Sequence, residues 1–175
     1  GKTDILLSLA YATHNNFTGR PIYKRAACYL HPHALKNLMH AANLASELGL
    51  RLKIFDAFRP VEAQWRMWQD MPNSKYLADP KIGSPHSRGI AVDLTLTRAD
   101  GQDLKMGTPF DTFKSDSHHG SLGLRTAEQR NRNLLLGIMT AAGWDYYSNE
   151  WWHYQLFHSS KYPLLSDKAS GTNLI

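Results

Sequence analysis

Cysteine is almost absent from this chain, since Cys28 is the only one among 175 residues. A single thiol excludes an internal disulfide framework and a metal site built from several thiolates. No uninterrupted apolar run approaches the roughly 18 residues needed to cross a bilayer, so we expect no membrane span. The sequence also lacks internal repeats, low-complexity segments and a linker rich in proline, glycine or serine. These absences predict one compact domain over residues 1–175.

Charge of one sign is never concentrated in the sequence, although basic residues outnumber acidic ones by 20 to 15. The formal net charge of +5 favours anionic surroundings without naming one. Nucleic-acid binding normally needs a basic stripe or an identifiable reading helix, and the sequence shows neither. We therefore expect no nucleic-acid partner.

Six segments carry the periodicity of regular secondary structure. Apolar residues at helical spacing, with glycine or proline near the ends, predict three helices. Runs rich in β-branched, aromatic or alternating apolar residues predict three strands. The expected order is a helix over 34–48, a strand over 50–58, a helix over 61–71, a strand over 90–96, a helix over 126–142 and a strand over 150–157. Because strict strand–helix–strand alternation is missing, we expect an α+β domain with a small, mainly antiparallel sheet flanked by helices.

Three of these segments carry more detailed expectations. The apolar stripe of the first helix includes Leu35, Met39 and Leu48. Alternation over 90–96 predicts a half-buried strand with Asp93 on its more polar face. The helix that begins near residue 126 starts with Thr-Ala-Glu-Gln, which is typical of a capping box.

Two short stretches contain the residue types that hold zinc. The first supplies His86 and Asp93, and the second, Glu150-Trp151-Trp152-His153, supplies another histidine. Two imidazoles and a carboxylate can provide three ligands and leave a fourth position open, where a spare glutamate can act. Gly89 lets the chain turn, so that His86 and Asp93 can aim at one point. Because Asp93 and His153 belong to expected strands, the site would lie on the sheet.

Each of these residues also has an ordinary explanation when it is considered alone, as a loop histidine or a solvent-facing carboxylate. Glu150 precedes His153 by three residues, and positions i and i+3 of a strand face opposite sides. We therefore expect Glu150 to lie just before the strand or at a bulge. The helical zinc signature His-Glu-x-x-His and its inverted form are absent. The spacing alone leaves a zinc site and a coincidental grouping equally open.

The sequence resembles the D-alanyl-D-alanine dipeptidases, a family of zinc peptidases, over nearly the whole chain. The family pattern Ser-x-His-x-x-Gly-x-Ala-x-Asp matches the stretch from Ser84 to Asp93, with Pro85 as a minor departure. Its Glu-x-x-His matches Glu150 and His153. Further shared motifs are Tyr11-Ala12-Thr13, Asp56-Ala57-Phe58-Arg59-Pro60, Met106-Gly107, Phe110-Asp111 and Asn131-Arg132.

The resemblance implies a role for each residue that matches a family motif. Two catalytic residues are implied, with Glu150 as the base and Arg59 stabilising the transition state. The implied ligands of a single zinc ion are His86, Asp93 and His153, and the residues implied to lie near the substrate are Tyr11, Asp56 and Ser84.

The implied activity is zinc-dependent hydrolysis of D-Ala-D-Ala to two D-alanines, with a small D,D-dipeptide as the substrate. Two alternatives remain open. One is a zinc D,D-carboxypeptidase or endopeptidase that acts on longer peptidoglycan stems with the same metal site. The other is a zinc-stabilised binding module without catalysis, which a spare glutamate disfavours because structural zinc normally fills all four positions with protein ligands. The basic charge, and a chain that opens at Gly1 instead of methionine, favour a periplasmic bacterial protein, with the cytoplasm as the alternative.

Overall fold

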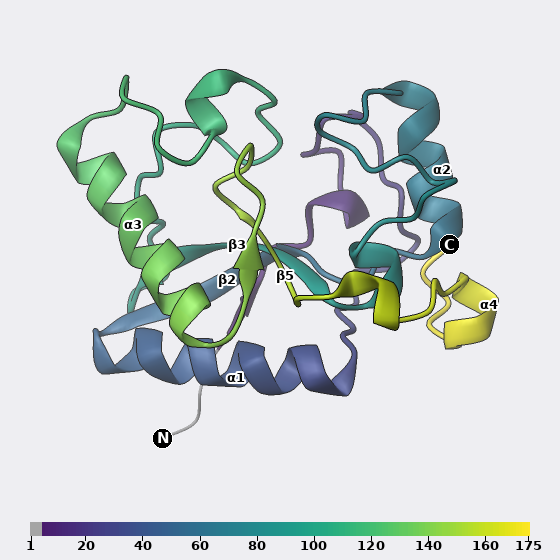
Figure 1. The fold of residues 1–175 in the computed structure, drawn as a ribbon, viewed down its shortest axis with the longest axis horizontal. Helices are drawn as coiled ribbons and strands as arrows, with labels where there is room; N and C mark the ends of the chain where they lie inside the picture. Colours follow the sequence, from purple (N-terminus) through teal and green to yellow (C-terminus); the bar gives the residue numbers. More distant parts are fainter. Residues whose placement is uncertain (1–4) are drawn as a thin grey trace.

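The computed structural model describes residues 5–175 and shows an α+β domain (Figure 1). Gly1, on which the expectation of a periplasmic protein partly rests, lies outside the described residues. With η denoting a 3-10 helix, the elements follow one another as β1 (Leu6–Leu7), η1 (Ala10–Ala12), α1 (Pro32–Glu47), β2 (Leu50–Asp56), α2 (Val61–Asp70), η2 (His86–Arg88), β3 (Ala91–Arg98), η3 (Ser115–Ser117), α3 (Thr126–Ala141), β4 (Asp145–Tyr146), β5 (His153–Gln155), η4 (Ser159–Lys161) and α4 (Asp167–Ser170).

The strands form one sheet in the order β1-β2-β3-β5-β4. Only β1 and β2 run parallel among these neighbours, so the expected small, mainly antiparallel sheet is confirmed. The central strand β3 is buried at every position except Arg98. The expectation that this strand is half-buried is therefore wrong, because helices cover one of its faces and the loops of the candidate site cover the other.

Helices α1 and α3 pack against each other and against the central strands, and in Figure 1 α1 runs along the bottom of the sheet. The buried stripe of α1 contains Ala34, Leu38, Ala41 and Ala45. Small side chains let the helix axis approach the sheet closely. The expected stripe was partly wrong, because Leu35, Met39 and Leu48 are exposed.

Strand β2 contains an irregularity that bears directly on the site. Ile54 pairs with Leu94 of β3, but the next paired residues are Asp56 and Asp93, so Phe55 is an extra residue in β2. In a regular strand Asp56 would share the face of Ile54. The bulge instead brings Asp56 to the side of the sheet on which Asp93 lies.

The start of α3 differs by one residue from the expected capping box. Arg125 is the N-cap, and its backbone N–H donates to Oε2 of Glu128 at 3.0 Å. Thr126 is the first residue inside the helix, so the box that begins at Thr126 is wrong in register. Throughout residues 5–175, no helix is long and apolar enough to cross a membrane.

Candidate metal centre and active site

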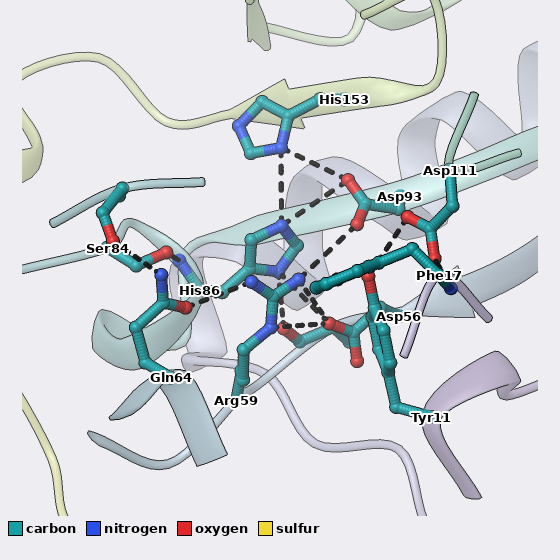
Figure 2. Close-up of polar contacts among 12 residues, drawn as sticks. Tyr11, Phe17, Asp56, Arg59, Gln64, Ser84, His86, Asp93, Asp111 and His153 are labelled. Atoms are coloured by element: carbon teal, nitrogen blue, oxygen red, sulfur yellow. Dashed lines mark hydrogen bonds and ion pairs between the residues drawn. The ribbon is translucent and has the colours of Figure 1, made fainter. Parts of the chain in front are cut away.

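The candidate metal ligands come from η2, β3 and β5 and converge on one side of the sheet (Figure 2). Asp93 of β3 lies directly opposite His153 of β5 in the strand pairing, so both side chains leave the sheet on the same side. His86 begins η2, and Gly89 ends it in a left-handed conformation with φ of 67° that leads the chain into β3. All three candidate ligands are buried.

Their ligand atoms form a nearly equilateral triangle. His86 Nε2 lies 3.2 Å from His153 Nδ1 and 3.3 Å from Asp93 Oδ1. His153 Nδ1 lies 3.1 Å from the same Asp93 oxygen. A tetrahedral zinc ion with bonds of about 2.0–2.1 Å separates neighbouring ligand atoms by about 3.3 Å. The spacing of the three atoms therefore fits zinc.

The outer nitrogens of the two imidazoles show where their protons lie. His86 Nδ1 is 2.7 Å from the carbonyl oxygen of Ala57, which can only accept, so Nδ1 carries the proton. His153 Nε2 is 3.0 Å from Gln155 Oε1 and donates to it in the same way. Because the outer nitrogens are engaged in this way, both rings turn their inner nitrogens, His86 Nε2 and His153 Nδ1, toward each other and toward Asp93. Such an arrangement suits a bound cation.

The charge state of Asp93 completes the ligand set. Burial by itself raises the pKa of this carboxyl group, but the imidazoles of His86 and His153 hold the pKa well below its usual range. The site thus offers one carboxylate ion and two imidazoles, a combination that zinc accepts.

Arg59 follows the end of β2 and is only 4% exposed. Its Nε and Nη2 donate to Oδ2 of Asp56 at 3.0 and 2.8 Å. Its Nη1 donates to Oε1 of Gln64 at 2.9 Å, and its guanidinium carbon lies 5.1 Å from the ring centre of Tyr11. Nη2 also lies 3.7 Å from Oδ2 of Asp93 (Figure 2). The guanidinium is therefore fixed beside the ligand triangle.

Asp56 stands behind Arg59, and it does not line the cavity described below. One of its carboxylate oxygens accepts from Arg59, and the other accepts from the hydroxyl of Tyr23 at 2.7 Å. Both oxygens are thus engaged by buried donors. This geometry favours an indirect role for Asp56, in which it orients the guanidinium.

A cavity of about 300 Å³ lies over the ligand triangle. Its wall contains seven of the eight residues singled out from the sequence, and Asp56 is the exception. The seven are Tyr11, Arg59, Ser84, His86, Asp93, Glu150 and His153. Trp152 also lines the cavity, whereas Trp151 and Tyr154 are buried in the main core.

Glu150 lies in the turn before β5, as expected from its spacing to His153. The residue is 6% exposed, and it lines the same cavity as the ligand triangle. Burial raises the pKa of its carboxyl group to about 8, and the negative charges of Asp93 and Asp111 act in the same direction. The carboxyl group is therefore placed where it can accept a proton from a molecule in the cavity.

Asp111 is a cavity residue to which the sequence analysis gave no role, although its motif with Phe110 was noticed. Its oxygens accept from the Tyr11 hydroxyl at 2.9 Å and from the Phe17 backbone N–H at 3.2 Å. Burial raises the pKa of Asp111 to about 7. The backbone of Asp111 also marks it as an unusual residue, because its φ of 60° is uncommon outside glycine.

Comparison with known proteins agrees with this geometry. The family model described as D-ala-D-ala dipeptidase, Peptidase_M15, matches residues 2–169. The chain belongs to this family. The family resemblance expected from the motifs is therefore confirmed, and the protein is assigned to a family of peptidases.

Several relatives of the dipeptidase family have the same description. The D-alanyl-D-alanine dipeptidase of Escherichia coli is 44% identical over 95% of this chain and 86% of its own length. That of Enterococcus faecium is 36% identical over 87% of this chain and 86% of its own length. A solved structure, a mutant of the vancomycin resistance D,D-pentapeptidase VanY in complex with zinc, has a TM-score of 0.48 at 15% identity and covers 75% of this chain and 76% of that chain.

Proposed function

We propose that this protein hydrolyses D-Ala-D-Ala to two D-alanines and that one zinc ion is its cofactor. The observation that carries the proposal is the triangle of inward-facing ligand atoms, which shares one cavity with Glu150 and Arg59. Relatives with 34% to 44% identity that are named D-alanyl-D-alanine dipeptidase support the choice of substrate.

His86, Asp93 and His153 would hold the zinc ion, whose Lewis acidity lowers the pKa of a water molecule and polarises a carbonyl group. Glu150 is the proposed general base, because its carboxyl group faces the same cavity. It takes a proton from the attacking water and returns that proton to the amine that leaves. The raised pKa of Glu150 suits both halves of this transfer, since the group binds and releases a proton near neutral pH.

Arg59 is the proposed donor to the carbonyl oxygen as negative charge grows on it. Asp56 and Gln64 engage three of its five N–H bonds, which leaves one N–H on each terminal nitrogen. Because these contacts fix the guanidinium before substrate arrives, little reorganisation is needed when charge develops. Asp56 is thus proposed as a residue that orients Arg59.

A dipeptide presents an ammonium group at one end, and the cavity offers a carboxylate to meet it. Asp111 lines the cavity, and its interaction with the Tyr11 hydroxyl fixes the position of both residues. We assign the substrate ammonium to Asp111 and Tyr11, since an ammonium group near Asp111 favours its ionised form. Ser84 also lines the wall, while its hydroxyl accepts from the backbone N–H of His86 at 3.2 Å.

The same metal site would serve a carboxypeptidase or endopeptidase of longer peptidoglycan stems. Asp111 favours the dipeptidase, because a carboxylate in the cavity wall is matched by a free ammonium group, whereas an acylated nitrogen carries no positive charge to pair with it. A non-catalytic zinc module is disfavoured by Glu150, which the three-ligand set does not require.

Hydrolysis by one zinc-loaded preparation tests these alternatives. We expect turnover of D-Ala-D-Ala, with much slower cleavage of L-Ala-L-Ala and of an acylated tripeptide that ends in D-Ala-D-Ala. The Glu150→Gln variant is expected to keep its zinc and to lose about 100- to 10,000-fold of its turnover, the range for a general base. Zinc content is measured by metal analysis of each protein.

The outcomes separate the candidates. Faster cleavage of the acylated tripeptide would identify the protein as a carboxypeptidase or endopeptidase. Stoichiometric zinc without cleavage of any of the three peptides would identify a binding module. Wild-type turnover in Glu150→Gln would assign the proton transfer to another group.

We propose that the protein acts in the periplasm, where dipeptide released from the cell wall is met, and the alternative is the cytoplasm. The net charge of +5 supports this placement, because the wall and the membrane surface are anionic. Fractionation of the source cells, followed by detection with an antibody, tests it. Recovery with cytoplasmic markers would contradict it.

A further inference from the structure

The turn that carries Glu150 is held in part through its neighbour Trp151. Among residues 5–175 there is no hydrogen bond to the Glu150 carboxylate, so the place of this group depends on the backbone that bears it. Trp151 donates from its backbone N–H to the Ser117 carbonyl at 3.0 Å. Its indole Nε1 donates to Oγ1 of Thr108 at 2.9 Å. Together with the bond from the His119 backbone N–H to the Ser148 carbonyl at 2.9 Å, these two bonds tie the turn to the loop before α3.

The hydroxyl of Thr108 takes part in several of the hydrogen bonds between the loop and the turn, and the donor and acceptor of each bond can be assigned. Ser117 Oγ donates to the carbonyl oxygen of Thr112, which can only accept. Thr108 must then donate to Ser117 Oγ, which lies 2.8 Å away. Both lone pairs of Thr108 Oγ1 remain free to accept. One takes the indole N–H of Trp151, and the other faces Nη2 of Arg132 at 3.4 Å.

Arg132 of α3 fixes the loop that contains Thr108. It is 4% exposed, and it donates to the carbonyl oxygens of Met106 at 2.6 Å and His118 at 3.2 Å. Its guanidinium carbon also lies 5.8 Å from the ring centre of Trp151. Gly107 suits this close packing, because its backbone φ is 87° and a Cβ there would lie 3.4 Å from Arg132 Nη2 and 2.6 Å from Leu124 Cδ2. Met106, Gly107 and Arg132, which belong to motifs shared with the family, thus lie outside the cavity and hold the loop against α3.

We propose that Thr108 is a positioning residue for the general base, and this inference rests on the proposed function. Its hydroxyl joins α3, through Arg132, to the turn before β5, through Trp151. Loss of the hydroxyl would leave the indole N–H and one guanidinium N–H without an acceptor, which favours movement of the turn. Catalysis is sensitive to such movement, since a displacement of about 1 Å can cost about 100-fold in rate.

The test compares Thr108→Val, which removes the hydroxyl at nearly constant volume, with Thr108→Ser, which keeps it. In zinc-loaded enzyme we expect Thr108→Val to lower kcat at least about tenfold, with KM changed less than about twofold. Thr108→Ser is expected to stay within about threefold of wild-type kcat, because its hydroxyl can make the same bonds. Thr140→Val on the exposed side of α3 is the matched control and should behave as wild type.

Amide hydrogen exchange gives a readout that does not depend on activity. In Thr108→Val we expect faster exchange in a peptide that covers residues 147–153 and unchanged exchange in α1, with zinc content as in wild type. Unchanged exchange at 147–153, or equal kcat in the valine and serine variants, would overturn the inference. Failure of the wild-type protein to cleave D-Ala-D-Ala would overturn the proposed function instead, while the exchange result would still decide whether Thr108 holds the turn.

Discussion

Arg59 illustrates how one buried charge is oriented by its neighbours. The family resemblance singled out Arg59 through the motif that ends at Pro60, but the partners of Arg59 come from a bulge and from a helix. Asp56 reaches it through the irregularity in β2, and Gln64 reaches it from α2. The ion pair with Asp56 is open to inference from the sequence, because the two residues are three positions apart, but the Gln64 contact does not follow from spacing along the chain.

Replacement of Arg59 by lysine is expected to lower turnover about 100-fold, the scale for loss of one donor to a developing oxyanion. Lysine keeps the positive charge between Asp56 and Asp93, so we expect the fold and the zinc content to be retained. Lysine lacks the planar set of N–H donors that holds the guanidinium in place. Steady-state kinetics with D-Ala-D-Ala, alongside thermal unfolding, measures both effects.

Arg20→Lys is the matched control, because Arg20 is an exposed arginine that pairs with Asp70, and neither residue lines the cavity. It should leave turnover unchanged. An Arg59→Lys enzyme with wild-type turnover would remove Arg59 from the mechanism. Arg59→Ala is a poorer test, since it leaves two buried carboxylates without their partner and costs about 3–5 kcal/mol in stability.

The residues of the ligand triangle and Glu150 could be named from the sequence, because their types stand in two dense stretches and both stretches match family motifs. Asp111 was given no role for the opposite reason. It is a lone carboxylate in a loop, and its importance arises from Tyr11 and Phe17, which lie about 100 residues away in the chain. Its left-handed backbone conformation is visible only in the structure.

At the scale of elements, η2 and the glycine that follows it set the direction of His86. Gly89 has φ of 67°, and a Cβ there would lie 3.2 Å from the backbone nitrogen of His31, which itself donates to the Gly89 carbonyl at 2.8 Å. The sequence suggested a turn at this glycine. It could not reveal that α1 begins directly against it.

The substitution Gly89→Ala is expected to lower the free energy of unfolding by about 1–3 kcal/mol, because a side chain is strained at this φ and crowds His31. Since η2 carries His86, we also expect weaker zinc binding. Chemical denaturation and zinc titration measure these effects.

Gly137→Ala on α3 is the control for Gly89→Ala, as a Cβ there meets nothing within 4 Å. In the interior of a helix this change should stabilise the protein by about 0.5–1 kcal/mol. A Gly89→Ala protein as stable as wild type would show that η2 tolerates a different backbone. We therefore expect the free energy of unfolding to fall in Gly89→Ala and to rise in Gly137→Ala.

At the scale of the whole molecule, the fold class and the order of the long elements followed from periodicity. The predicted helices over 34–48, 61–71 and 126–142 correspond to α1, α2 and α3 within two residues at each end. The short strands β1 and β4 and the helix α4 were not predicted, because segments of two to four residues carry no periodicity. The bulge in β2 was also invisible, since it depends on the register with β3.

Zinc is expected to stabilise the entire domain, because its ligands belong to elements that are far apart in the chain. Free zinc at about 1,000 times its Kd contributes about 4 kcal/mol to stability. For a protein of this length that corresponds to a rise in Tm of roughly 10 °C. Calorimetry of metal-free protein, before and after addition of zinc, measures the shift.

Two histidine variants sharpen this measurement. His153→Ala should lose the zinc-dependent rise in Tm, whereas His40→Ala, which alters an exposed histidine of α1, should retain it. An equal rise in both variants would show that zinc binds elsewhere on the protein.

The direct pairing of Asp93 with His153 has a consequence for refolding. If β5 slipped by one position along β3, His153 would turn toward the layer formed by α1 and α3 and could no longer join the triangle. The ligand set therefore exists in a single alignment of the two strands. A cation present during refolding would bind only the native register of β3 and β5. It would therefore favour correct strand pairing over shifted registers, in addition to its role in catalysis.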